Sequence, residues 1–149
     1  MSRRRPNLLY IMSDQHTQRV TGCYGDPVAR TPALDRLAAR GVAFENAYTP
    51  SPICLPARMS ALTGCYPVTQ ECWTNTDMLP SDRATFAHAL GAAGYRPILV
   101  GRLHAIGPDQ MHGFARREVG DHSTNWVGGL RHDMGVLEKT NDPYRVSLQ

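Results

Sequence analysis

A cysteine and an arginine four residues apart begin the stretch of this sequence that is richest in chemistry. Cys54 is followed by Pro56, which the first turn of a helix tolerates, and Gly64 marks the expected end of that helix. Cys54 is therefore expected at a helix N-terminus, where unpaired backbone N–H groups and the helix dipole favour a negative group. Such a position can activate a thiol and hold an oxyanion, and Arg58 adds a permanent positive charge on the same helical face.

The elements that must position these residues follow a β-α-β pattern. The apolar run 8–12 is typical of a strand buried on both faces of a parallel sheet. The other expected elements are a helix between Thr31-Pro32 and Gly41, an extended piece at 42–44, a helix from Pro80 or Ser81 to Gly94, and a buried strand at 97–100. Because sites collect at the carboxyl ends of parallel strands, the polar clusters 14–16 and 101–104 are candidates. Beyond Gly107 the sequence predicts no secure element.

Composition and charge limit the classes of function. The 149 residues are 42% hydrophobic, enough for one core but hardly for two. Lys and Arg number 16 against 13 Asp and Glu, and a net charge of +3 does not predict a nucleic-acid partner. The first apolar run is too short for a signal peptide or a membrane span, so we expect a cytoplasmic protein. The four cysteines contain no C-x-x-C motif, which favours reduced thiols, with two disulfides as the alternative.

The stretch from Cys54 to Gly64 resembles the signature of the sulfatase family, C-x-P-S/A-R followed by a small-residue pair and L-x-T-G. The agreement extends to Pro6-Asn7 with the apolar run into Asp14, to T-P-x-L-D-x-L-A from Thr31, to G-V-x-F from Gly41 and to G-x-x-H from Gly101. Residues 107–114 are similar in particular to the choline-sulfatase-like branch. The resemblance implies an α/β fold: the N-terminal part of an alkaline-phosphatase-like, mostly parallel sheet flanked by helices. Residues 1–149 would then be an incomplete portion of a sulfatase catalytic domain.

The resemblance also implies a modified nucleophile. In the family the motif cysteine is oxidised to formylglycine after synthesis, which makes Cys54 the modified residue and a formylglycine-generating enzyme a partner. A hydrated aldehyde has two hydroxyls, one to attack sulfur and one to expel sulfate when the carbonyl re-forms. The implied catalytic residues are Cys54, Arg58, Arg102 and His104. Arg102 stands where the family has lysine, so a planar guanidinium replaces a compact ammonium group.

A divalent metal site is implied by the same resemblance. Asp14 and Gln15 match the family's first metal ligands, and the group derived from Cys54 completes the ligands found in this chain. Carboxylate and amide oxygens suit Ca²⁺, with Mg²⁺ or Mn²⁺ as the alternatives, better than Zn²⁺. The bound ion would polarise the substrate.

The sequence thus predicts a sulfuric ester hydrolase whose 149 residues are inactive by themselves. One alternative is a phosphonate monoester or phosphate diester hydrolase of the same superfamily, since Asp14-Gln15 fits both. Another is a non-catalytic module that binds anions or a partner through an exposed sheet edge. The expected partners are a small sulfate ester and the formylglycine-generating enzyme, together with a missing C-terminal portion or a second copy of the chain. No nucleic acid or membrane partner is expected.

Overall fold

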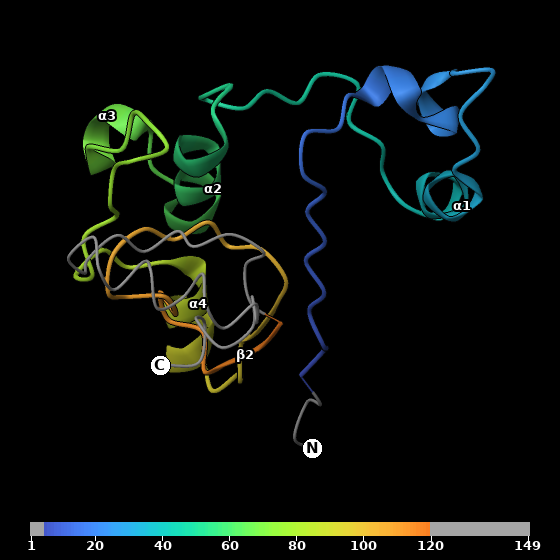
Figure 1. Ribbon diagram of the computed structural model, residues 1–149. Coiled ribbons are helices and arrows are strands. Elements are labelled where there is room, and N and C mark those ends of the chain that lie inside the picture. Colours follow the sequence, from blue (N-terminus) through green and yellow to red (C-terminus); the bar gives the residue numbers. More distant parts are fainter. Residues whose placement is uncertain (1–4, 120–149) are drawn as a thin grey trace, which may run out of the picture. The chain divides into compact units, whose positions relative to one another are not determined.

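The computed structural model describes residues 5–119, and the chain divides into two compact units that part after Tyr48 (Figure 1). The first unit contains the 3₁₀ helices η1 (Gln18–Val20) and η2 (Gly22–Tyr24) and the helix α1 (Pro32–Arg40). The second contains helices α2 (Cys54–Thr63), α3 (Pro67–Gln70) and α4 (Phe86–Ala92) and strands β1 (Ile98–Val100) and β2 (Arg116–Val119). Within residues 5–119, no helix is long and apolar enough to cross a membrane. The single domain predicted for residues 1–149 reaches beyond the described part of the chain.

Helix α1 forms where the sequence predicts it, and it packs against η2. Thr31 precedes Pro32 and joins the two elements: its Oγ1 accepts a hydrogen bond from the backbone N–H of Gly22 at 2.8 Å and donates to Asp35 Oδ1 at 2.9 Å. A Cβ atom at Gly22 would lie 2.9 Å from both carboxylate oxygens of Asp35. The approach of η2 to α1 therefore depends on glycine at this position.

The strand predicted for residues 8–12 is not formed in the first unit, and this expectation was wrong there. Leu9 is 85% and its neighbour Tyr10 64% exposed, so neither face of the segment is buried. The extended piece predicted at 42–44 is likewise no strand, and Phe44 uses its carbonyl to accept a hydrogen bond from Tyr24 Oη at 2.9 Å. A strand of a parallel sheet needs neighbouring strands for its ladder and for burial, and the described residues of the first unit form none.

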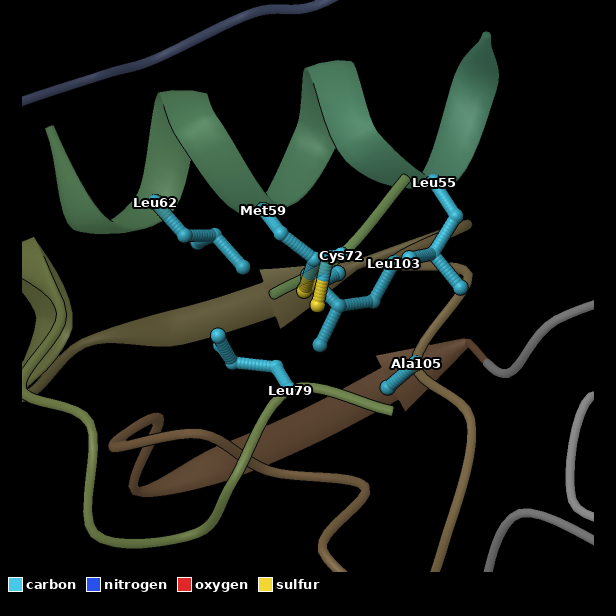
Figure 2. Close-up of a cluster of buried hydrophobic side chains, with 7 residues drawn as sticks. All are labelled: Leu55, Met59, Leu62, Cys72, Leu79, Leu103 and Ala105. Carbon is cyan, nitrogen blue, oxygen red and sulfur yellow. The ribbon is translucent and has the colours of Figure 1, made fainter. Parts of the chain in front are cut away.

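The core of the second unit lies beneath α2. Leu55, Met59 and Leu62 follow helical spacing and point from one face of α2 toward the strands (Figure 2). They meet four further buried side chains, those of Cys72, Leu79, Leu103 and Ala105. Full burial of a leucine or methionine side chain contributes roughly 1.5–3 kcal/mol. This packing fixes the rotation of α2 about its axis. It therefore determines which side chains near the helix N-terminus face the segment that follows β1.

Strands β1 and β2 form a two-stranded parallel sheet in which Ile98 pairs with Arg116. The predicted strand at 97–100 is confirmed as β1, but its burial on both faces is not: Ile98 is 48% and Val100 68% exposed, and only Leu99 packs against the core. β2 was missed because Arg-Arg-Glu-Val has no apolar run to reveal it. The parallel pairing nevertheless agrees with the β-α-β pattern read from the sequence.

Helix α4 begins later than predicted. It starts at Phe86 rather than at Pro80 or Ser81 because Thr85 forms a capping box with His88. Thr85 Oγ1 accepts a hydrogen bond from the backbone N–H of His88 at 3.4 Å, and His88 Nδ1 accepts one from the backbone N–H of Thr85 at 3.2 Å. These reciprocal bonds satisfy donors that the first turn of a helix leaves without partners.

A buried histidine lies beside the start of α4. His112 is 1% exposed, and its Nδ1 lies 3.3 Å from Asp109 Oδ2. Its carbonyl accepts a hydrogen bond from Thr85 Oγ1 at 2.7 Å. Burial lowers the pKa of His112, while the Asp109 carboxylate opposes the change. His112 is thus a structural residue of the interior.

Acid is expected to destabilise the protein through His112. The pKa of His112 in the folded protein is below the ordinary value of 6.5, so at a pH near that value the unfolded chain binds more protons than the folded protein. Above pH 6.5 the contribution of the neutral imidazole to stability is therefore fully present. It is lost as the pH falls from 6.5 toward the lowered pKa of His112. Melting temperatures measured between about pH 7.5 and 5.5 should fall more steeply for the wild type than for His112→Gln. Equal slopes in the two proteins would contradict this assignment.

Candidate functional site

Cys54 is the first residue of α2, as predicted, and it is half-buried. The preceding residue, Ile53, has extended backbone and no side-chain oxygen that could cap the helix. Asn75, from the loop after α3, takes over this role. Its Oδ1 accepts a hydrogen bond from Cys54 Sγ at 3.2 Å and another from the backbone N–H of Leu55 at 3.0 Å. The position of the thiol is therefore fixed by the helix on one side and by Asn75 on the other.

Asn75 was missed by sequence reasoning, although one local signal pointed to such a residue. A helix that starts after isoleucine lacks its own cap, so an acceptor must come from elsewhere in the chain. The loop that supplies it is held by Asp77, whose Oδ2 accepts hydrogen bonds of 2.7 Å from the backbone N–H groups of Trp73 and Thr74. These two bonds lower the pKa of Asp77. The carboxylate thereby supports the loop on which Asn75 lies.

Removal of the Asn75 side chain is expected to destabilise the protein by about 1 kcal/mol, the usual worth of a helix N-cap. Asn75→Ala leaves the N–H of Leu55 and the thiol of Cys54 without their acceptor. Asn75→Asp is the matched control, because it keeps the acceptor oxygen and places a negative charge at the positive end of the helix. Thermal or urea unfolding of the three proteins measures the effect. If Asn75→Asp lowers the free energy of unfolding as much as Asn75→Ala does, the acceptor oxygen does not account for the stabilisation.

Arg58 follows Cys54 by one helical turn and joins α2 to the segment after β1. Its side chain is buried, at 7% exposure, and its Nη1 donates a hydrogen bond to the carbonyl oxygen of Arg102 at 3.0 Å. Arg102 Nη2 lies 3.1 Å from His104 Nδ1. The second unit thus brings together three of the predicted residues, Arg58, Arg102 and His104, where the N-terminal half of α2 contacts the segment after β1.

The contact between Arg102 and His104 determines the state of the imidazole. A guanidinium group can only donate hydrogen bonds, so Nδ1 of His104 must be the acceptor. The ring proton then lies on Nε2, which makes Nε2–H a donor. The replacement of the family's lysine by Arg102 is consistent with this arrangement, because a planar fork can contact the ring and still offer further N–H groups.

The backbone of His104 is in the left-handed region, with φ of 62°. A residue other than glycine or asparagine rarely adopts this conformation, which costs on the order of 1–3 kcal/mol. The strain is compensated by burial: Leu103 on one side and Ala105 on the other belong to the core, and His104 itself is 6% exposed. Strain of this kind is typical of residues held in place for function.

Asp14 and Gln15, the predicted metal ligands, belong to the first unit and are exposed. Asp14 Oδ1 accepts a hydrogen bond from the backbone N–H of Gln15 at 3.0 Å. An open pocket of about 410 Å³ in the first unit is lined among others by Ser13, His16, Thr21, Leu34, Leu37 and Val42, but not by Asp14 or Gln15. The two predicted ligands belong to the first unit, whereas Cys54 belongs to the second.

The donor atoms of Asp14 and Gln15 fit a hard divalent cation in kind, since both side chains offer oxygen. They do not fit it in number, because Ca²⁺ takes six to eight oxygen ligands. Across residues 5–119, no three His, Cys, Asp or Glu side chains gather in a group that could hold an ion. By themselves, Asp14 and Gln15 could supply only two of the ligands that such a site needs.

Comparison with known proteins decides the family. The sulfatase family model matches residues 6–132, most of the chain. The chain belongs to the sulfatase family. The chain is 39% identical over 121 residues to a choline-sulfatase of Rhizobium meliloti, a match that covers 81% of this chain and 24% of the relative. It is also 36% identical over 113 residues to human arylsulfatase A, covering 71% of this chain and 22% of the relative.

Solved structures confirm the α/β fold class. One structure, of a protein in complex with its substrate D-glucosamine-2-N,6-O-disulfate, matches the chain with a TM-score of 0.73 and 33% identity, over 78% of this chain and 23% of that chain. A 2-O GAG sulfatase matches with a TM-score of 0.61 and 30% identity, over 71% of this chain and 24% of that chain. The chain spans about a quarter of the length of these relatives and corresponds to their N-terminal part.

Proposed function

We propose that the protein is a sulfuric ester hydrolase whose nucleophile is a formylglycine made from Cys54. The observation that carries the proposal is the position of Cys54 at the N-terminus of α2, one turn before a buried arginine. That arginine, Arg58, is hydrogen-bonded to Arg102, which in turn contacts His104. A nucleophile, two permanent positive charges and an imidazole are groups that can serve in the hydrolysis of a sulfate monoester.

Each residue of the second unit has a role in this chemistry. When present, the hydrated aldehyde at Cys54 supplies one hydroxyl that attacks sulfur and a second that loses its proton as the carbonyl re-forms and sulfate leaves. The backbone N–H of Leu55 and the amide of Asn75 orient residue 54 at the end of the helix. Arg58 holds negative charge next to the nucleophile, and the positive charge of the Arg102 guanidinium neutralises sulfate oxygens. Nε2–H of His104 donates to the leaving oxygen.

Asp14 and Gln15 would hold a divalent cation, Ca²⁺ in the first instance and Mg²⁺ or Mn²⁺ as alternatives. A cation of this type supplies charge that polarises a sulfate oxygen. The partners we propose are a small sulfate ester as substrate and a formylglycine-generating enzyme that modifies Cys54. Choline sulfate and an aryl sulfate are suitable first substrates, because a choline-sulfatase and an arylsulfatase are among the relatives.

Mass spectrometry of the peptide that contains Cys54 tests the proposal directly. In protein produced together with a formylglycine-generating enzyme, the peptide should be lighter by about 18 Da, the difference between cysteine and the aldehyde. Hydrolysis of choline sulfate or an aryl sulfate should rise with the fraction of aldehyde. A preparation that hydrolyses sulfate esters at full rate with an intact thiol would contradict the proposal.

A second activity is favoured by Gln15, which stands next to Asp14 where many sulfatases have a second aspartate. The same nucleophile could act on a phosphonate monoester or a phosphate diester. Rates on an aryl sulfate and on an aryl phosphonate monoester, measured side by side, distinguish the two functions by their ratio of kcat/KM. If the aldehyde-bearing protein hydrolyses neither ester, a non-catalytic role in binding anions is favoured instead.

A further inference from the structure

We propose that Gln110 is a positioning residue for His104. Its side-chain amide holds the segment that follows His104, and it thereby keeps Nε2 of the imidazole where the leaving group is expected. This inference rests on the proposed function for its effect on activity. The hydrogen bonds that carry it are a property of the fold and can be tested separately.

The segment 101–107 needs side chains to satisfy its carbonyl groups. It follows β1 directly and bends away from the sheet, with Gly101 at a φ of 91° and Gly107 at 99°. The carbonyl of Gly101 accepts a hydrogen bond from Arg117 Nη2 at 3.4 Å, and that of Arg102 accepts one from Arg58. Buried carbonyls without partners are costly, so each of these side chains stabilises the path of the segment.

Gln110 performs this role on the far side of His104. Its Nε2 donates to the carbonyl of Ala105 at 3.1 Å and to the carbonyl of Gly107 at 2.7 Å. The two hydrogens of one amide group are therefore both used. Gln110 is itself held in place, because its own carbonyl accepts a hydrogen bond from Arg117 Nη1 at 3.4 Å.

His104 thus lies between two fixed points. Arg58 holds the residue before Leu103, and Gln110 holds the residue directly after His104. Because the φ of 62° at His104 is strained, the backbone relaxes if one of these points is released. Burial of Leu103 and Ala105 opposes large movements, but it does not fix the direction of the imidazole to within a fraction of an ångström.

The first experiment removes the two N–H donors of the Gln110 side chain and keeps its length. Gln110→Met in the full-length protein should lower kcat for an aryl sulfate by roughly 10-fold to 100-fold, because a displacement near 1 Å is enough for such a loss. KM should change by less than about threefold, since the altered group acts on the leaving oxygen rather than on binding. Glu118→Gln, an equally small change on the exposed side of β2, is the control and should leave kcat unchanged.

A second variant separates positioning from packing. Gln110→Lys restores a donor of similar reach, so its kcat should exceed that of Gln110→Met at comparable melting temperature. Mass spectrometry of the Cys54 peptide measures the aldehyde content of each protein. It thereby shows whether a lower kcat results only from a lower content of aldehyde. Hydrogen exchange of the amides in residues 102–107 should be faster in Gln110→Met than in the wild type and slowed again in Gln110→Lys.

The outcomes distinguish this inference from the proposed function. If the aldehyde-bearing wild type hydrolyses no sulfate ester, the proposed function fails, and hydrogen exchange alone decides whether Gln110 holds the segment. If the wild type is active and Gln110→Met keeps more than half of its kcat, Gln110 does not position His104. Equal kcat in the methionine and lysine variants would also overturn the inference. Should Gln110→Met not fold, Gln110→Glu, which keeps the shape of the side chain and lacks the two N–H donors, supplies the same hydrogen-exchange test against the wild type.

Discussion

Replacement of Cys54 by alanine is expected to lower kcat/KM for a sulfate ester by about a thousandfold or more, the usual consequence of losing a nucleophile. The methyl group of alanine cannot be converted into an aldehyde. Helix α2 should remain intact, because alanine favours helices and the backbone N–H of Leu55 keeps its bond to Asn75. The melting temperature of Cys54→Ala should therefore stay close to that of the wild type while hydrolysis is lost.

Other cysteines provide the controls for this experiment. Cys65 is exposed, and Cys65→Ala should keep full activity. Cys72 is fully buried in the core, and burial raises the pKa of its thiol, so it stays protonated and unreactive. Cys72→Ala should lower the melting temperature rather than the activity of the folded protein. Hydrolysis that survives in Cys54→Ala and disappears in Cys65→Ala would refute the assignment of the nucleophile.

Replacement of Arg58 by methionine is expected to cost both activity and stability. The loss of a buried positive charge one turn from the nucleophile should lower kcat by roughly a hundredfold to a thousandfold, as for other groups that stabilise charge in a transition state. The carbonyl of Arg102 would lose its partner at 3.0 Å, which should destabilise the fold by about 1–3 kcal/mol. Arg58→Lys should be intermediate, because it keeps the charge and loses the planar fork.

Enzyme kinetics and urea unfolding, measured on the same preparations, separate the two effects. Arg36, which is exposed on α1, offers a control: Arg36→Met removes an equal charge and should change neither kcat nor stability appreciably. If Arg58→Met lowers stability and leaves kcat of the folded protein unchanged, Arg58 is a structural residue only. If Arg58→Met and Arg36→Met lower kcat to the same extent, the loss is caused by the change in net charge.

Local sequence patterns predicted the helices that matter most for the site. Proline in the first turn and glycine after the last define α1 and α2, and the ends of both agree with the structure. The position of Cys54 at a helix N-terminus follows from the same residues. These predictions succeed because helix signals act between residues that lie within one or two turns of each other.

Patterns that depend on neighbouring strands were less reliable. The apolar run 8–12 indicates burial, yet the described first unit forms no strand there. Conversely, β2 pairs with β1 although its sequence is mostly charged. Strand formation depends on partners that lie far away in the sequence, so neither an apolar run nor its absence decides it.

The residue types and spacing from Cys54 to Gly64 were sufficient to place a nucleophile and an arginine on one helical face and to indicate the family. The contact of Asn75 with the thiol, the strained backbone of His104 and the hydrogen bonds from Arg58 and Gln110 that surround it came only from the folded chain. Each of these contacts joins residues that the fold brings together without any periodic signal in the sequence. Carbonyl groups left without backbone partners after β1 take whichever donors the packing of α2 and β2 presents, and only the three-dimensional arrangement selects those donors.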